Sequence, residues 1–322
     1  MPNHCISHVK DIDGVSSAAL VVAAKGGTFR LVDYDAFYDA LASVPEEADE
    51  VVICDIGTDP NAAGRLAKAL AALAKRAKVT YIDHHYLAPA DRAKVKRSGV
   101  SVHHDTKDCA SMLTYLTFKD RLPPAAKLLA LYGAVTDYMD DSARAAKLME
   151  NFDRHFVLLE ATLLSYALAK NGKDYSYVET LVRELAEMRT PHTIERVGED
   201  ALDQAEVIRR LAEQVQKNGV KLGRLAYMET SQSATGNVAK LLLGAFGVVL
   251  GVSYKPKTGG MVEASLRSTS ECRLHLGREI GRIAARHGGT GGGHKKAAGF
   301  SVPVGEIQGV LKDLNSRLSK VQ

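Results

Sequence analysis

The chain contains no tryptophan, few aromatic residues and only four cysteines among its 322 residues. Because aromatic residues make up 6% of the chain, no platform for stacking the bases of single-stranded nucleic acid stands out. The cysteines lie far apart and form no CxxC pair, so the sequence indicates neither a disulfide framework nor a thiolate zinc site. We expect Cys5, Cys54, Cys109 and Cys272 to be reduced and buried.

The chain also lacks a long hydrophobic run and a strong excess of either charge. No stretch approaches the roughly 18 apolar residues that indicate a membrane span, and no signal-peptide pattern opens the chain. We therefore expect a cytoplasmic protein without membrane contacts. The formal net charge of +4, from 42 basic and 38 acidic side chains, fits an anionic ligand without requiring a polyanion.

Apolar segments typical of β-strands alternate with helical patterns through about the first 140 residues. The apolar segments are "HCISHV" (4–9), "TFRLVDY" (28–34), "EVVICDI" (50–56), "KVTYID" (78–83) and "GVSVHH" (99–104). Between two of them, Leu66, Leu70 and Leu73 recur at helical spacing. Such strands, separated by helices, predict a parallel sheet with helices on both faces. Ligands of these sheets bind at the carboxyl ends of the strands.

Residues that can bind metal ions follow several of these predicted strands. The stretch "YIDHHY" places Asp83, His84 and His85 directly after an apolar run. The other candidates near strand or helix ends are His8, Asp11, Asp13, Asp55 and Asp137. A single aspartate after a strand is often only the N-cap of the next helix, and a lone histidine is more often structural. Three consecutive polar residues at a buried strand end are costly unless they are bonded or bind a ligand.

The type of these residues indicates the chemistry of the site. Carboxylates crowded together raise one another's pKa unless a cation neutralises them. Carboxylates with imidazoles and no thiolate are typical of Mn(II), with Mg(II), Co(II) or Fe(II) as alternatives. Their number favours two metal ions that share a carboxylate, an arrangement that hydrolyses phosphoesters. The sequence therefore predicts a metal-dependent phosphoesterase.

The second half of the chain changes character twice. Residues 142–218 form one helical pattern after another, and the last hundred residues alternate between predicted strands and helices. The segment "HGGTGGGHKKAAGF" (287–300) is the densest in glycine. Glycine backbones can approach a ligand closely and form an anion-binding nest of N–H groups. We expect a phosphate or nucleotide cradle, with a flexible connector as the alternative.

These motifs resemble those of the DHH phosphoesterases, a family named for the triplet seen here as Asp83, His84 and His85. The segments "GGGHKKAAGF" and "SLRS" resemble the DHH-associated C-terminal domain. The resemblance implies an α/β fold with a parallel-sheet catalytic domain at residues 1–141 and a helical connector at 142–218. It also implies a smaller mixed α/β substrate-binding domain at 219–322, with the active site in the cleft between the two domains.

The resemblance also implies roles for individual residues. His8, Asp11 and Asp55 would hold one metal ion, with His4 as an alternative to His8. Asp13, Asp55, His84 and Asp137 would hold the second ion, so that Asp55 bridges the pair. Substrate phosphate or the leaving group would contact His85, oriented by Asp83. In the C-terminal domain, the implied substrate contacts are Arg267, Gly292, Gly293 and His294.

The implied function is a Mn(II)-dependent phosphodiesterase of the compact archaeal RecJ-like or nano-RNase type. We expect an exonuclease that acts on single-stranded or short RNA or DNA and releases nucleoside monophosphates. The open alternatives are a cyclic-dinucleotide phosphodiesterase of the c-di-AMP type, a 3'-phosphoadenosine 5'-phosphate phosphatase and a non-enzymatic scaffold. A replication or repair protein is an expected partner, and a homodimer is compatible with the sequence although no pattern specifies one.

Overall fold

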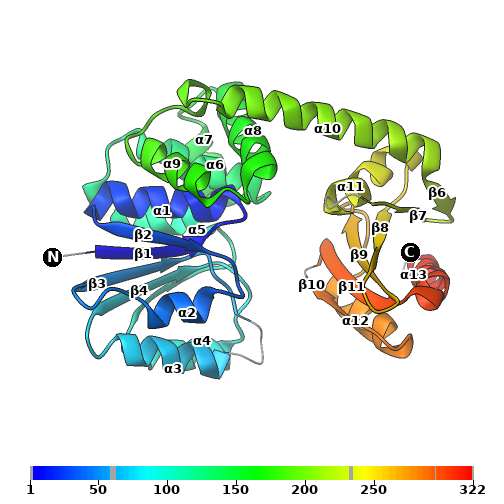
Figure 1. Cartoon of the computed structure of the whole chain (residues 1–322), viewed down its shortest axis with the longest axis horizontal. Helices are drawn as coiled ribbons and strands as arrows, with labels where there is room; N and C mark the ends of the chain where they lie inside the picture. Colours follow the sequence, from blue (N-terminus) through cyan, green and yellow to red (C-terminus); the bar gives the residue numbers. More distant parts are fainter. Residues whose placement is uncertain (1–2, 59–62, 232–234, 294, 321–322) are drawn as a thin grey trace. The chain divides into compact units, whose positions relative to one another are not determined.

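The computed structural model describes residues 3–58, 63–231, 235–293 and 295–320. The chain forms two compact units, residues 1–204 and 205–322 (Figure 1). The first is built on a parallel sheet and the second on a mixed sheet, so the predicted α/β fold class is confirmed. The domain boundaries predicted after residues 141 and 218 stay predictions.

The first unit contains a five-stranded sheet in the order β2-β1-β3-β4-β5, in which all neighbouring strands are parallel. The strands are β1 (Asn3–His8), β2 (Thr28–Val32), β3 (Glu50–Cys54), β4 (Lys78–Asp83) and β5 (Ser101–His104). From Val51 to Cys54 every residue of the central strand β3 is buried. Continuous burial is the pattern of a parallel strand with both faces covered.

Helices cover both faces of this sheet (Figure 1). One layer consists of α1 (Ile12–Lys25), α5 (Ala110–Phe118), α6 (Ala126–Thr136), α7 (Ala143–Met149), α8 (Arg154–Asn171) and α9 (Tyr175–Ala186). The other consists of α2 (Phe37–Ala42), α3 (Ala63–Leu73) and α4 (Pro89–Lys96). In α3, the predicted stripe of Leu66, Leu70 and Leu73 is buried. Each layer has its own hydrophobic core against the sheet.

The second unit contains a six-stranded sheet in the order β10-β11-β9-β8-β7-β6, parallel only between β7 and β8. Its strands are β6 (Val220–Leu222), β7 (Leu225–Glu229), β8 (Leu250–Lys257), β9 (Met261–Ser268), β10 (Thr290–Gly293) and β11 (Ala297–Pro303). The helices of this unit are α11 (Thr235–Phe246), α12 (Leu276–Arg286) and α13 (Ile307–Lys320). Every second residue of β11 is buried, as expected for a strand with one face on the core.

The structure differs from the expected elements in two ways, and the first difference has a local cause. The segment "KLGRLAYME" reads as one strand, but Gly223 divides it into the hairpin β6–β7. Its φ of 57° is a left-handed conformation that glycine adopts readily and that two-residue hairpin turns require. Short 3₁₀ helices, absent from the sequence reading, occur at Lys119–Arg121, Pro191–Thr193 and Val304–Glu306. Among the described residues, no helix combines the length and apolar character needed to cross a membrane.

The long helix α10 (Val197–Asn218) begins beside the end of α8. Asp200, which is 4% exposed, accepts hydrogen bonds from Lys170 Nζ at 2.6 Å and Asn171 Nδ2 at 2.8 Å. Burial alone would raise the pKa of Asp200, but the bonds from Lys170 and Asn171 lower it. The ionised carboxylate therefore ties α10 to α8.

Replacing Asp200 with Asn is expected to lower the free energy of unfolding by about 1 to 3 kcal/mol at pH 7, because bonds to a charged group are lost. Since folding lowers the pKa of Asp200, its contribution is complete above the unfolded-state value near 3.9 and is lost as the pH falls through the lower folded value. Urea unfolding at pH 7 and at about pH 3 tests this; the gap between wild type and variant should shrink at the lower pH.

Asp203 provides the matched control. It also accepts a bond from Lys170 Nζ at 2.6 Å, but its side chain is 68% exposed. The Asp203→Asn variant should lose less than about 1 kcal/mol, as is usual for exposed ion pairs. Equal losses in the two variants would show that the buried position of Asp200 is unimportant.

Candidate metal centre

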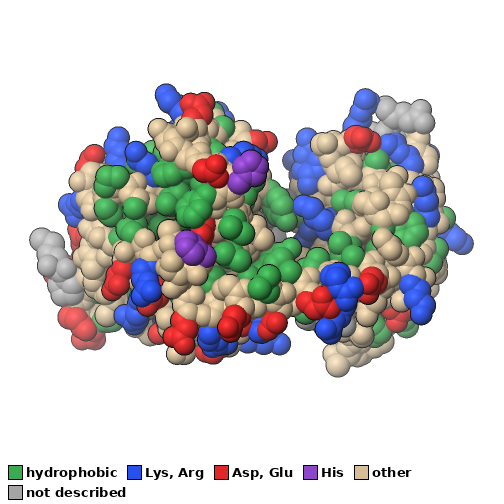
Figure 2. Space-filling model, turned by 90° about the horizontal axis from the view of Figure 1, so that it is seen from above, with side chains coloured by type: hydrophobic (Ala, Val, Ile, Leu, Met, Phe, Trp, Pro, Cys, Tyr) green, Lys and Arg blue, Asp and Glu red, His purple; other side chains and the backbone are tan. Residues whose placement is uncertain are grey.

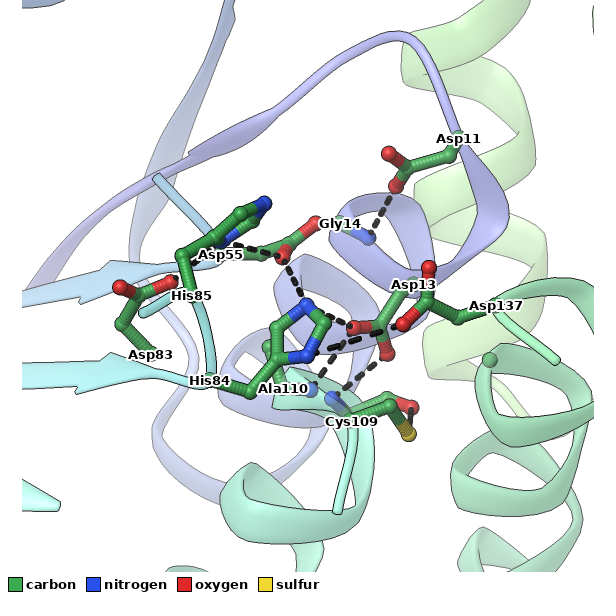
Figure 3. Close-up of polar contacts among 12 residues, drawn as sticks. Asp11, Asp13, Gly14, Asp55, Asp83, His84, His85, Cys109, Ala110 and Asp137 are labelled. Carbon is green, nitrogen blue, oxygen red and sulfur yellow. Dashed lines mark hydrogen bonds and ion pairs between the residues drawn. The ribbon is translucent and has the colours of Figure 1, made fainter. Parts of the chain in front are cut away.

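Polar side chains gather at the carboxyl edge of the parallel sheet (Figure 3). β1 ends at His8, Asp55 follows β3, and β4 ends at Asp83 with His84 and His85 directly after it. The start of α1 adds Asp11 and Asp13, and Asp137 follows the last residue of α6. Because β1, β3 and β4 are adjacent and parallel, their ends meet at one edge.

Three overlapping groups in this cluster could each hold a metal ion. They are His8, Asp11 and Asp55; Asp13, His84 and Asp137; and Asp55, His84 and His85, with candidate ligand atoms within 4.8 Å of one another in each group. The structure thus brings together all six residues predicted as metal ligands. Their assignment as ligands stays a prediction. The alternative His4 lies at the opposite end of β1 and contacts Thr28 Oγ1 at 2.8 Å.

Asp55 is the most confined carboxylate of the cluster. It is 1% exposed, and neither of its carboxylate oxygens has a hydrogen-bond partner among the described residues. The histidine nitrogens nearest to the Asp55 carboxylate are His84 Nε2 at 3.3 Å and His8 Nδ1 at 3.8 Å. Burial, together with the charges of Asp11 and Asp13, raises the pKa of Asp55 well above its usual range. Burying an ionised carboxylate without hydrogen-bond partners costs free energy, and a bound cation removes that penalty.

The backbone of Asp55 is also unusual. Its φ is 56°, a left-handed conformation that non-glycine residues seldom adopt, although Asp and Asn tolerate it best. Its amide donates a hydrogen bond to Ile82 O at 3.0 Å, which holds the residue against β4. Strained backbone of this kind is common where a side chain must be aimed at a ligand.

Asp13 is held by the start of α5. Its carboxylate accepts hydrogen bonds from the amides of Ala110 at 2.7 Å and Ser111 at 2.8 Å (Figure 3). Amides at a helix N-terminus stabilise negative charge there. Burial and the charges of Asp13 and Asp11 raise the pKa of Asp137 to about 8. The two carboxylates face His84, whose Nε2 lies 3.7 Å from Asp13 and whose Nδ1 lies 3.6 Å from Asp137.

Carboxylates orient the other two histidines. His8 Nδ1 lies 2.9 Å from Asp11 Oδ2. Burial would raise the pKa of Asp11, but its bond with His8 lowers it to about 2. His85 Nδ1 lies 2.8 Å from Asp83 Oδ1. Burial would lower the pKa of His85, but the hydrogen bond and charge of Asp83 raise it to about 9.

The structure adds residues that sequence reasoning missed. Asp33 Oδ1 lies 3.7 Å from His8 Nε2, and Tyr34 Oη lies 3.2 Å from His85 Nε2. The strand-end rule could have found both, because they directly follow β2, which pairs with β1. His104 Nε2 lies 2.7 Å from the carbonyl oxygen of His85. Nothing in the sequence marks His104 beyond its place at the end of an apolar segment.

Three of the predicted substrate contacts of the C-terminal domain lie on two strands of the same sheet. Arg267 is in β9, and Gly292 and Gly293 are in β10, with β11 between the two strands. The predicted contact His294 lies outside the described residues. Their roles, and the predicted cleft between the two domains, stay predictions.

Two features hold this glycine segment in place. Gly293 has a φ of 132°, which favours glycine. A Cβ added to Gly277 would lie 1.9 Å from the carbonyl oxygen of Gly293, so both positions require glycine. Lys296 Nζ donates to the carbonyls of Thr269 at 2.7 Å and Cys272 at 2.5 Å. The amine of Lys296 therefore joins β11 to the loop after β9.

Comparisons with known proteins agree with this fold. Residues 222–320 match the DHHA1 domain family. No curated protein matches the chain. A pGpG-specific phosphodiesterase, PggH of Vibrio cholerae, has a similar structure (TM-score 0.64, 14% identity, 100% of both chains covered). So does a DHH-domain protein described as a member of the S1p family of ribosomal proteins (TM-score 0.72, 16% identity, 98% of this chain and 86% of that chain covered).

RecJ of Thermus thermophilus, solved in complex with Mn2+, is a further relative in structure (TM-score 0.63, 16% identity). The similarity covers 100% of this chain and 52% of RecJ. At such identities the likeness establishes the fold, and the DHHA1 match identifies the C-terminal domain. Residues 222–320 therefore form a DHHA1 domain, joined to a parallel-sheet domain that carries an Asp-His-His motif, and the whole chain shares its fold with these solved proteins.

Proposed function

We propose that the chain is a Mn(II)-dependent phosphodiesterase, an exonuclease that acts on single-stranded or short oligonucleotides and releases nucleoside monophosphates. The observation that carries this proposal is Asp55, a buried carboxylate without hydrogen-bond partners among the described residues that belongs to two candidate metal groups. Such a residue suits a ligand shared by two cations. The mixed carboxylate and imidazole donors favour Mn(II).

The residues divide between two ions and the substrate. His8, Asp11 and Asp55 would hold one ion, and Asp13, Asp55, His84 and Asp137 the other. When bound, such a pair of ions lowers the pKa of a water molecule and neutralises charge on the phosphoryl group. Asp83 fixes the ring of His85 through Nδ1, so that Nε2 is the atom that would contact a substrate oxygen.

The second unit supplies the features expected of nucleotide binding. Arg267 would clamp a phosphate through its planar guanidinium, and the backbone of Gly292 and Gly293, with His294, would contact the adjacent nucleotide. Basic and acidic side chains are interspersed on the face seen in Figure 2, without a continuous basic track there. A cytoplasmic location, a replication or repair partner and a homodimer remain proposals from the sequence.

A length series of end-labelled RNA and DNA, from two to about twenty nucleotides, tests this function. The protein is incubated with Mn(II), with Asp83→Ala and His84→Ala as inactive controls, and products are separated on gels. We expect wild type to release nucleoside monophosphates and both variants to be inactive. Cleavage of only the shortest strands would identify a nano-RNase, and progressive shortening of longer strands a RecJ-like exonuclease.

The alternatives give different results in the same assay. Cyclic dinucleotides and 3'-phosphoadenosine 5'-phosphate are included as additional substrates. Hydrolysis of either compound without cleavage of any linear strand would replace the exonuclease proposal by the matching alternative. If the protein hydrolyses none of these substrates, a non-enzymatic scaffold is the alternative that remains.

A further inference from the structure

Tyr34 lies in the loop between β2 and α2, with its hydroxyl oxygen 3.2 Å from Nε2 of His85. Its ring centroid is 4.8 Å from that of His8, and the ring meets His85 edge-on at 6.3 Å. The residue is nevertheless 46% exposed. Tyr34 therefore contacts two residues of the candidate metal centre while part of its side chain faces solvent.

The orientation of His85 determines what Tyr34 can do. The Nδ1–H group of His85 donates a hydrogen bond to the carboxylate of Asp83, which is 1% exposed and also accepts a hydrogen bond from the Tyr81 hydroxyl at 3.1 Å. Nε2 is therefore the ring nitrogen that remains for Tyr34 and for substrate. A substrate oxygen that approaches Nε2 from the side of Tyr34 also comes within hydrogen-bonding range of the Tyr34 hydroxyl.

We propose that Tyr34 is a catalytic residue whose hydroxyl donates a hydrogen bond to the leaving oxygen of the substrate, beside Nε2 of His85. The inference rests on the proposed phosphodiesterase function and assigns one residue of its site. In the free protein, Tyr34 and His85 satisfy each other, and in the complex the oxygen bonds to both. In this step an oxygen from water bonds to phosphorus, and the electron pair of the broken bond stays on the leaving oxygen, which takes its proton from solvent. Tyr34 transfers no proton; it stabilises the charge that develops on the leaving oxygen as its bond to phosphorus breaks.

The surroundings favour a neutral donor at this position. The carboxylates of Asp33, Asp55 and Asp83 lie within 4 Å of ring nitrogens of His8 or His85, the two histidines that Tyr34 contacts, and they disfavour a further negative charge there. A phenol keeps its proton at neutral pH and donates it in a hydrogen bond. The backbone turns here, because the amide of Ala36 donates to the carbonyl of Asp33 at 3.1 Å, and the amide of Tyr34 donates to Asp33 Oδ1 at 2.8 Å.

A pair of substrates with different leaving groups tests the proposal. They are the p-nitrophenyl ester of thymidine 5'-monophosphate and the dinucleotide in which a second thymidine replaces p-nitrophenol. The nucleoside oxygen needs stabilisation as it leaves, whereas p-nitrophenolate is stable without it. Tyr34→Phe should lower kcat for the dinucleotide about 10- to 100-fold, the effect of one hydrogen bond to a charged group. For the p-nitrophenyl ester, we expect kcat to change less than about 3-fold.

Tyr38→Phe is the matched control, because it also removes one tyrosine hydroxyl. Tyr38 lies in α2, and its ring stacks on the Arg65 guanidinium, 3.7 Å from the ring centroid. This variant should behave as wild type on both substrates. A second measurement does not depend on turnover: the ¹⁵N resonance of His85 Nε2 in metal-free protein should move in Tyr34→Phe and not in Tyr38→Phe. That shift reports the contact between Tyr34 and His85 directly.

The outcomes separate the two claims. An equal loss on both substrates, or no loss on the dinucleotide, would overturn the role of Tyr34 while an active wild type upholds the proposed function. An unmoved His85 resonance would overturn the contact itself. If wild type hydrolyses neither substrate, the proposed function fails and the role of Tyr34 fails with it.

Discussion

Replacing Asp55 with Asn is expected to abolish hydrolysis and, at the same time, to stabilise the metal-free protein. The variant removes a carboxylate shared by two candidate metal groups, so the rate should fall about 1,000-fold or more, or roughly 4 kcal/mol in the barrier. Without metal, the wild-type carboxylate is buried and lacks hydrogen-bond partners among the described residues. Removing its charge should raise the free energy of unfolding by roughly 1 to 3 kcal/mol. Asn tolerates the left-handed backbone of this position.

The pH dependence of this gain has a definite sign. Folding raises the pKa of Asp55, so its ionised form destabilises the metal-free protein at neutral pH. The penalty disappears as the pH falls below the unfolded-state value near 3.9, where the group is protonated in both states. Calorimetry of metal-free wild type and Asp55→Asn at pH 7 and about pH 4 should show converging stabilities.

Asp39→Asn serves as the control, because Asp39 is exposed on α2. It should change neither hydrolysis nor stability by more than about 0.5 kcal/mol. An Asp55→Asn variant that retains activity, or that is less stable than wild type without metal, would contradict the assignment of Asp55 as a metal ligand.

The second large effect is expected at Gly133 in α6. A Cβ built on Gly133 would lie 2.0 Å from Ser111 Oγ and 2.5 Å from Asp13 Oδ1. Alanine usually favours a helix over glycine by about 1 kcal/mol. Here the clash should outweigh that gain and destabilise the protein by about 2 to 3 kcal/mol, as overpacking does. Because Asp13 must move, activity should fall about 100-fold or more, as 1 Å displacements in active sites do.

Gly244→Ala is the matched control in α11, because Gly244 is exposed and an added Cβ would meet no atom within 4 Å. This variant should be as stable as wild type or up to about 1 kcal/mol more stable, with unchanged activity. Chemical unfolding and hydrolysis assays of both variants make the comparison. A Gly133→Ala protein with normal activity would show that Asp13 does not need its observed position.

The sequence predicts the part of the site that depends on local pattern. Apolar strands separated by helices lead to a parallel sheet, and the rule for strand ends then places Asp55, His84 and His85 at one edge. The stripe of leucines in α3 is predicted for the same reason, since helical periodicity is a local property. Position alone does not establish which of these side chains bind metal ions and which contact substrate.

What the sequence does not predict depends on which strands are neighbours. The strand-end rule marks Tyr34 as a candidate, but its contact with His85 depends on the strand order β2-β1-β3-β4-β5, which no segment encodes by itself. His104 reaches the His85 backbone because β5 pairs with β4. The tie between Asp200 and Lys170 joins residues 30 positions apart on separate helices, and neither stands out in its own helical pattern.

The most direct test of a shared two-metal centre is a stepwise titration of metal-free protein with Mn(II), with bound ion and dinucleotide hydrolysis measured at each step. We expect two ions per chain, with hydrolysis rising only as the second binds, and Asp55→Asn should lose both binding and activity. Full activity with a single bound ion, or two bound ions in Asp55→Asn, would contradict a centre bridged by Asp55.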